Sequence, residues 1–250
     1  MPLFGSTDPQ AEAQAESLLR EAIALEPGYA QALVQLSLVL WTRIAAGQLQ
    51  DTAQARAEGL VLARRALAHC GDDADVLAMA GGRIALLANV QEGMALIEQA
   101  LALNPNSVKV ISTAAGHYAF AGQRAKALEC AARAARINPL EGAVQRNWSA
   151  GLAHFVVGEY EPALPYFASA IRVLPHFAAV AALRYHTASL GLLGRIDEAR
   201  AAATQLRAVM PELTVARARS HLDVDMNGII GRAATDAFCE GLRRAGIPEG

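Results

Sequence analysis

The chain has 250 residues, of which 53% are hydrophobic but only 5% aromatic, so its apolar content is mainly alanine and leucine, which favour helices. Its formal charge of -2 at pH 7 gives no electrostatic reason to expect nucleic acid or an anionic membrane as a partner. The three cysteines, Cys70, Cys130 and Cys239, lie far apart without a CxxC pair, which disfavours a disulfide framework or a zinc site. The first ten residues lack the pattern of a signal peptide, and no apolar stretch approaches the roughly 20 residues that span a bilayer, so we expect a soluble cytoplasmic protein.

Helix-ending residues recur at nearly regular intervals along the chain. They are Pro27, Gly71, Pro105, Pro139, Pro175 and Pro211, separated by 44, 34, 34, 36 and 36 residues. Proline cannot continue a helix and restricts the residue before it, so regular prolines mark regular helix ends. The pattern predicts pairs of antiparallel helices in one array over residues 1–250: a half repeat at 11–27, repeats at 30–71, 74–105, 108–139, 143–175 and 179–211, and a capping repeat at 213–250.

Small residues recur within each predicted unit at fixed distances from these terminators. Five residues before them stand Ala22, Ala66, Ala100, Ala134, Ala170 and Leu206, and twelve before stand Ala15, Gly59, Gly93, Ala127, Ala163 and Ala199. The preceding helices carry Ser37, Gly81, Ala115, Gly151 and Thr187 at one shared position. Small side chains at fixed places on a helix face allow a neighbouring helix to approach closely. Turn glycines follow at Gly122, Gly158 and Gly194 and separate the two helices of a pair.

The two ends of the array depart from this pattern. Residues 11–25 form a second helix whose partner is missing, which leaves two explanations open: the chain is a fragment of a longer protein, or this end self-associates. Near the other end we expect helices at 213–222 and 232–244. Between them, Asp223, Asp225, Asn227 and Gly228 match the opening of a calcium-binding EF-hand loop, but Ala234 stands where the bidentate glutamate is needed. We interpret this segment as a polar turn and expect no metal site.

The spacing and small residues resemble the tetratricopeptide repeat, clearest in GEYEPALPYFASAIRVLP (158–175) and GRIDEARAAATQLRAVMP (194–211). This resemblance implies an all-α, right-handed α-α superhelix with about five full helix-turn-helix repeats, a half repeat and a cap. The run INPLEGAVQRNWSAGLAHFVVGEYEPAL and the closing FCEGLRRAGIPE (238–249) also look similar to C-terminal repeat arrays of bacterial cyclase-like and winged-helix regulators. That likeness implies a sensory or regulatory context and transfers no cyclase chemistry.

A search for catalytic patterns finds none in the sequence. The six histidines are dispersed without a ligand spacing, and neither a phosphate-binding loop nor a nucleophile elbow occurs. We therefore expect no catalytic residue and no cofactor. In the resembled family the first helices of the repeats line a concave face that binds peptides. The inward positions here are Gln31, Val34, Leu38, Trp41, Asp75, Lys109, Ser112, Gln145, Trp148, Leu152, Phe155 and Arg184.

Three functions remain open at this stage. The first is a scaffold that binds a protein or peptide on that face, with neither nucleic acid nor membrane as a partner. The second is the regulatory tail of a cyclase-like protein or transcription regulator, and the third is an enzyme, disfavoured because no polar groups are seen to converge.

Overall fold

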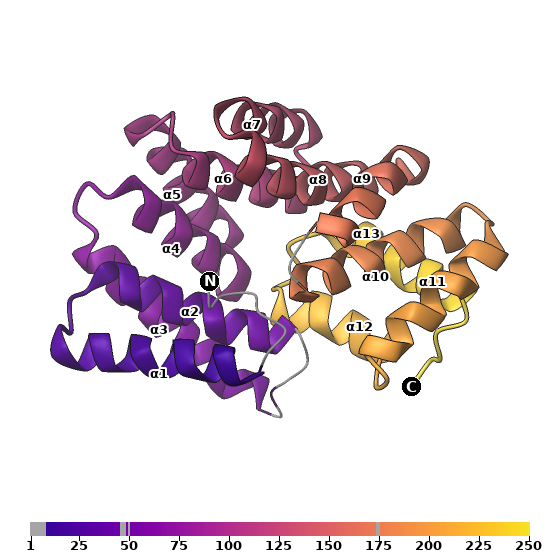
Figure 1. Cartoon of the computed structure of the whole chain (residues 1–250), viewed down its shortest axis with the longest axis horizontal. Helices are drawn as coiled ribbons and strands as arrows, with labels where there is room; N and C mark the ends of the chain where they lie inside the picture. The colour runs from indigo at the N-terminus through magenta and orange to yellow at the C-terminus, as the bar shows by residue number, and fades with distance from the viewer. Residues whose placement is uncertain (1–8, 46–48, 50, 174–175) are drawn as a thin grey trace. The chain divides into compact units, whose positions relative to one another are not determined.

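The computed structural model describes residues 9–45, 49, 51–173 and 176–250, and their side chains except those of 9–12, 140–145, 173 and 176–178. These residues form helices and no strand, which confirms the all-α expectation. The helices are α1 (Pro9–Leu25), α2 (Ala30–Ala45), α3 (Thr52–His69), α4 (Ala74–Leu87), α5 (Val90–Leu103), α6 (Val108–Phe120), α7 (Arg124–Ile137), α8 (Pro139–Val156), α9 (Tyr160–Val173), α10 (His176–Leu192), α11 (Ile196–Val209), α12 (Val215–Ser220), the π-helical turn η1 (His221–Asp225) and α13 (Arg232–Arg244). Figure 1 shows them as successive helical hairpins.

The chain forms two compact units. Unit 1 is Met1–Ala114 with Asp225–Asn227, and unit 2 is Ala115–Val224 with Gly228–Gly250. In unit 1, α2 packs against α3 and α4, and α4 packs against α5. Its core joins the first helices to the second: Leu33, Val34, Leu36 and Leu40 of α2 meet Leu62 and Ala66 of α3 and Val76 and Ala80 of α4. The hairpins of this unit are thus held together mainly by aliphatic side chains.

Unit 2 has an aromatic core instead. α10 packs against α9, α11 and α13 and also contacts α8. Tyr185 of α10 lies at its centre, with ring centroids 5.0 Å from Phe155, 5.9 Å from Phe167 and 4.6 Å from Phe238. These distances fall in the range of favourable aromatic pairs, so four elements are joined through one cluster.

The predicted terminators coincide with helix ends. The helices α1, α3, α5, α7 and α11 each end two residues before Pro27, Gly71, Pro105, Pro139 and Pro211, while Pro175 lies outside the described residues. The amide of the residue before the proline bonds the carbonyl four residues back, as from Asn104 to Ala100 and from Asn138 to Ala134. Proline lacks the amide that would continue this ladder, so the helix stops there.

The turn glycines adopt the backbone conformation that their residue type suggested. Gly122, Gly158 and Gly194 have φ values of 70°, 85° and 72°. After each, the next amide bonds a carbonyl five residues back, as from Gln123 to Tyr118 at 2.8 Å. This is the Schellman arrangement, in which a left-handed glycine satisfies the last carbonyls of a helix. The three equivalent hairpins of the chain are therefore closed by one local device.

Small residues do bring helices into close contact. A Cβ atom at Gly81 of α4 would lie 2.9 Å from the carbonyl oxygen of Gly93 in α5, and one at Gly151 would lie 2.7 Å from the Phe167 ring. Neither contact leaves room for a methyl group. The spacing of small residues thus predicted real helix–helix contacts.

The C-terminal segment differs from its expected form in one helix. α13 has the predicted bounds, but α12 covers only residues 215–220 and passes into η1 instead of continuing to 222. Asn227 and Gly228 then take φ values of 54° and 59°, which turn the chain away from any helical path. Their conformations agree with the polar turn inferred from their residue types.

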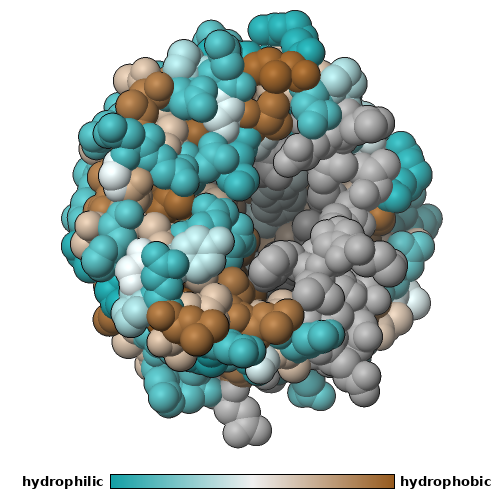
Figure 2. Space-filling model, turned by 60° about the vertical axis from the view of Figure 1, so that its left-hand side comes forward, coloured by the Kyte–Doolittle hydropathy of each residue, from teal (hydrophilic) through white to brown (hydrophobic). Residues whose placement is uncertain are grey.

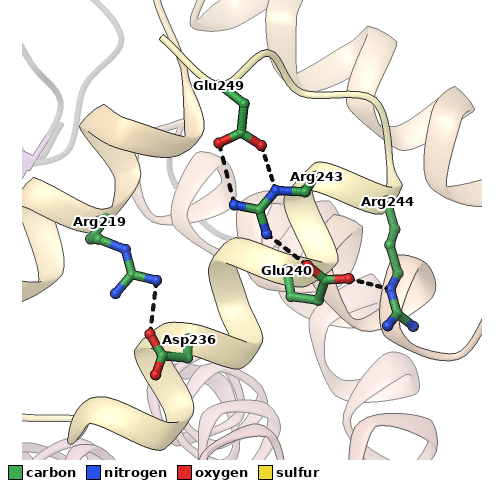
Figure 3. A network of polar contacts seen from close by, with 6 residues as sticks. All are labelled: Arg219, Asp236, Glu240, Arg243, Arg244 and Glu249. Atoms are coloured by element: carbon green, nitrogen blue, oxygen red, sulfur yellow. Dashed lines mark hydrogen bonds and ion pairs between the residues drawn. The ribbon is translucent and has the colours of Figure 1, made fainter.

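Ion pairs and a backbone contact fasten the end of this cap. Figure 3 shows Arg243 between Glu249 and Glu240, with Arg244 on the other side of Glu240. The carbonyls of Pro248 and Glu249 accept hydrogen bonds from the amides of Val215 and Ala216 at 2.8 and 2.9 Å. These two amides lie in the first turn of α12, where a helix supplies no acceptor of its own. The last residues of unit 2 therefore cap a helix that precedes them by about thirty positions.

Candidate functional site

In unit 1 the predicted binding residues lie on the first helices α2, α4 and α6. Six of them keep part of their surface exposed, and we call this set the unit 1 face. They are Gln31, Leu38, Trp41, Asp75, Lys109 and Ser112. Because α2 packs beside α4, residues of these two helices lie on neighbouring surfaces of the same unit. That these side chains form one ligand-binding surface stays a prediction.

The carboxylate of Asp75 contacts two polar side chains, those of Ser107 and Lys109. It accepts a hydrogen bond from Ser107 Oγ at 2.5 Å, and its other oxygen lies 3.5 Å from Lys109 Nζ. The residue also lines a cavity of about 520 Å³ together with Asp72, Asp73, Ala74, Leu103, Asn104 and Ser107. Asp73 is engaged as the N-cap of α4, where it accepts the amides of Asp75 and Val76. The cavity is thus polar and acidic, and one of its carboxylates, that of Asp73, already caps a helix.

Trp41 carries the aromatic part of the unit 1 face. Its ring lies 4.8 Å from the guanidinium carbon of Arg83, a cation–π distance. Arg83 comes from the middle of α4 and was missed by the sequence reasoning, which considered only four positions of each first helix. A signal was present: Arg83 is the single charged residue in the run VLAMAGGRIALL from Val76 to Leu87.

In unit 2 the tryptophan on a first helix is Trp148 of α8, at the register position that Val34 holds in α2. It is partly buried, with ring centroids 5.7 Å from Tyr185 and 6.2 Å from Phe167. Its body is therefore anchored in the aromatic core, while part of its surface stays open. The side chain of Gln145, predicted beside it, lies outside the described residues.

Four predicted binding residues are buried and need correction. Val34 and Leu152 have no exposed surface and Phe155 has 1%, because neighbouring helices cover them. Phe155 packs against Tyr160, Tyr185 and Phe238, so it is a core residue. Arg184 keeps only 7% of its surface exposed. Spacing along one helix placed all four on the inner side but could not show how much of that side the next helix covers.

The histidines assigned to packing behave in that way where the structure describes them. His154 stacks on Tyr166, with ring centroids 5.6 Å apart, and its Nδ1 lies 2.6 Å from a carboxylate oxygen of Glu159. The Nδ1 of His186 is buried without a hydrogen-bond partner. Burial lowers the pKa of the ring, and the positive charge of Arg195 lowers it further. Within the described part of the chain, no three His, Cys, Asp or Glu side chains gather as metal ligands. Asp223 of the EF-hand-like segment instead lies 4.0 Å from Arg219.

The surface also carries scattered apolar residues. Leu18 is 49% and Leu25 82% exposed, whereas Leu19 and Ile23 on the same helix pack against the core of unit 1. Figure 2 shows apolar patches separated by hydrophilic side chains on the face that it draws. Among the helices that the structure describes, none is both long and apolar enough to cross a membrane. Self-association through the N-terminal end of the chain stays a prediction.

Comparisons with known proteins identify the fold. No family model and no curated sequence matches the chain. The structure is similar to a thermophilic TPR protein of Thermus thermophilus, at 18% identity over 73% of this chain and 92% of that one, with a TM-score of 0.57. It is also similar to human IFIT1, solved as a dimer with PPP-AAAA, at 18% identity over 95% of this chain and 60% of that one, with a TM-score of 0.66.

A third similar structure is a tetratricopeptide repeat protein from Parabacteroides merdae. It is 15% identical, and the match covers 94% of this chain and 93% of that one with a TM-score of 0.52. Such low identities carry information on fold and none on ligands. Together with the helix hairpins, their proline and glycine terminators and their small contact residues, these matches show that the chain has the tetratricopeptide-repeat fold.

Proposed function

We propose that this chain is a non-catalytic scaffold that binds a protein or peptide on its first helices. The observation that carries the proposal is the placement of both tryptophans. The chain has two, Trp41 and Trp148, and each lies on a first helix with its ring partly buried against its own unit. Tryptophans whose bodies are fixed by packing and whose edges stay open are typical centres of protein contacts. Solenoid folds provide extended surfaces for such contacts.

The residues around Trp41 suit a peptide ligand. Gln31 and Ser112 offer side-chain hydrogen-bonding groups, and Leu38 offers apolar surface one helical turn from Trp41. A surface that mixes aromatic, aliphatic and neutral polar groups fits a polypeptide better than a polyanion. Lys109 is paired with Asp75, so its charge is partly neutralised before any ligand arrives. We therefore favour protein over nucleic acid, although the similar IFIT1 was solved with PPP-AAAA.

The two tryptophans also supply the assay. Peptides are selected from a phage-displayed random dodecapeptide library on the wild-type chain, and each is titrated while tryptophan fluorescence is recorded. Trp41→Phe and Trp148→Phe leave one reporter each, so the two units are read separately. We expect Trp41→Ala or Trp148→Ala to weaken the selected peptides at least tenfold, in line with the loss of about 1.4 kcal/mol or more at a contact centre.

A matched control separates binding from general surface effects. Val61 lies on the second helix α3 and is 56% exposed, so Val61→Ala removes exposed apolar surface away from the first helices. This variant should bind with wild-type affinity, and far-ultraviolet circular dichroism should show all variants folded. Selected peptides that bind both tryptophan-to-alanine variants with unchanged affinity would refute the proposal, as would a library from which nothing is enriched.

The regulatory alternative is a hypothesis of a different kind. It assigns the same binding surface to the tail of a cyclase-like or transcription-regulating protein, on the basis of sequence likeness in residues 137–164 and 238–249. The coding region upstream of Met1 tests it directly: an in-frame effector domain supports it, and an upstream stop codon contradicts it.

A further inference from the structure

Several surface arginines of this chain are paired with carboxylates. Arg20 lies 2.7 Å from Glu58, Arg64 lies 3.1 Å from Glu92, and Arg195 lies 2.7 Å from Glu198. These contacts are exposed, where an ion pair contributes little to stability. Burial makes a partner far more important, because a charge removed from water loses its hydration.

Arg83 shows the opposite arrangement. Its Nη1 is buried without a hydrogen-bond partner, and none of the described residues places a carboxylate within ion-pair distance of it. The guanidinium carbon lies over the Trp41 ring, 4.8 Å from its centroid, a cation–π contact that leaves Nη1 without an acceptor. Burial lowers the pKa of Arg83 to about 10, so the group is still charged at neutral pH.

Such a group calls for an explanation, because buried donors in native proteins almost always have acceptors. A purely structural role does not explain an unpaired guanidinium, because an apolar side chain of similar length would fill the same space without the desolvation cost. Arg83 as a residue keeps part of its surface exposed, although its Nη1 does not, so a rotation of the side chain has to bring Nη1 to an acceptor outside. A ligand that brings an anion would satisfy the orphaned donor and gain a charge-assisted hydrogen bond.

We propose that Arg83, whose guanidinium lies over the Trp41 ring, binds the carboxylate of an acidic residue in the protein ligand. This inference rests on the proposed function and names the chemistry of one part of the ligand. A carboxylate fits better than a phosphate because Arg83 offers a single charge: Arg43, the arginine of the neighbouring helix α2, is engaged with Glu16 at 2.6 Å. The planar fork of a guanidinium also matches the two oxygens of a carboxylate.

The test repeats the peptide selection on the wild type and on Arg83→Met. Peptides from the wild type should be enriched in Asp and Glu relative to the library, and the enrichment should vanish with Arg83→Met. One selected acidic peptide is then synthesised with its Glu→Gln twin and titrated calorimetrically. We expect the twin to bind the wild type at least tenfold more weakly and both peptides to bind Arg83→Met equally.

Arg64→Met is the matched control, because it removes an exposed, paired arginine from the same unit. It should leave the preference for Glu over Gln unchanged. Arg83→Met should also melt no lower than the wild type in the absence of ligand, since it removes an unsatisfied buried charge. If Arg83→Met does not fold, Arg83→Lys, which keeps the charge but not the fork, should reduce the preference for Glu over Gln.

The outcomes separate the two proposals. Peptides that are enriched without an acidic bias, or an equal loss of the Glu and Gln peptides with Arg83→Met, overturn the role of Arg83 and leave the scaffold function standing. An oligoadenylate RNA that binds through Arg83 while no peptide does would overturn both. An acidic bias that survives Arg83→Met would show that the carboxylate binds elsewhere on the chain.

Discussion

Gly59 and Gly93 occupy the same place in the repeat, twelve residues before a helix terminator, yet the structure predicts opposite effects for their replacement by alanine. A Cβ atom at Gly93 would overlap backbone atoms of α4, namely the carbonyl oxygen of Gly81 and the amide nitrogen of Ala85. A Cβ atom at Gly59 would meet the tip of Leu87 at 3.3 Å and Ser37 Oγ at 3.7 Å, and the leucine can move.

The magnitudes follow from two opposing terms. Alanine is favoured over glycine inside a helix by about 1 kcal/mol, which both variants gain. Overpacking costs about 1–3 kcal/mol and reaches the upper part of that range where backbone must shift. Gly93→Ala should therefore lower the free energy of unfolding by about 2 kcal/mol. Gly59→Ala should leave it unchanged or raise it by up to about 1 kcal/mol.

Urea denaturation followed by circular dichroism at 222 nm measures both variants against the wild type. Equal m-values would show that the changes concern stability and not the extent of unfolding. If Gly93→Ala proved as stable as Gly59→Ala, the close backbone contact between α4 and α5 would be wrong. The packing account given for the other small residues would then fail with it.

Three further predictions concern buried groups of unit 2. Arg184→Met should leave the free energy of unfolding unchanged or raise it by up to about 4 kcal/mol, because it replaces a buried guanidinium whose Nε has no partner in the described structure. A large fall in the melting temperature, measured by calorimetry, would instead reveal a structural role. The pKa of His186 is lowered by burial, so the folded state binds a proton less readily than the unfolded chain, and stability should fall as pH drops from about 6.5. His186→Leu should flatten the pH dependence of the urea midpoint. A pH dependence equal to that of the wild type would contradict this reasoning. Cys239 is fully buried and burial raises the pKa of its thiol, so a thiol reagent at pH 7 should modify it only in denaturant. The partly exposed Cys70, whose thiol pKa is also raised by burial, should react slowly in the native protein.

Local features of the fold were predictable because single residue types determine them. Pro105 and Pro139 cannot continue a helix, and Gly122 alone of its neighbours adopts a left-handed conformation without strain, so hairpin ends could be assigned from spacing. The shortening of α12 was not foreseen, since nothing in its composition forbids helix at His221. There the turn at Asn227 and the contact with the last residues decide the path of the backbone.

The exposure of the proposed binding residues was predictable only in part. The inward positions identified Trp41 and Trp148, which the structure leaves partly open, but also Phe155, which Tyr185 and Phe238 cover. Coverage of this kind depends on residues far away in sequence, such as those of α13. Arg83 was overlooked for the converse reason: its reach to Trp41 depends on the length of its side chain and not on its place in the helical period.

The capping of α12 by the residues that follow α13 has a consequence for how unit 2 opens. First-turn amides of a helix normally exchange their hydrogens with water quickly, because no acceptor protects them. The amides of Val215 and Ala216 are protected here by carbonyls near the end of the chain. The exchange rates of these two amides would therefore report the detachment of Pro248 and Glu249 from α12, before any turn of α12 itself unwinds.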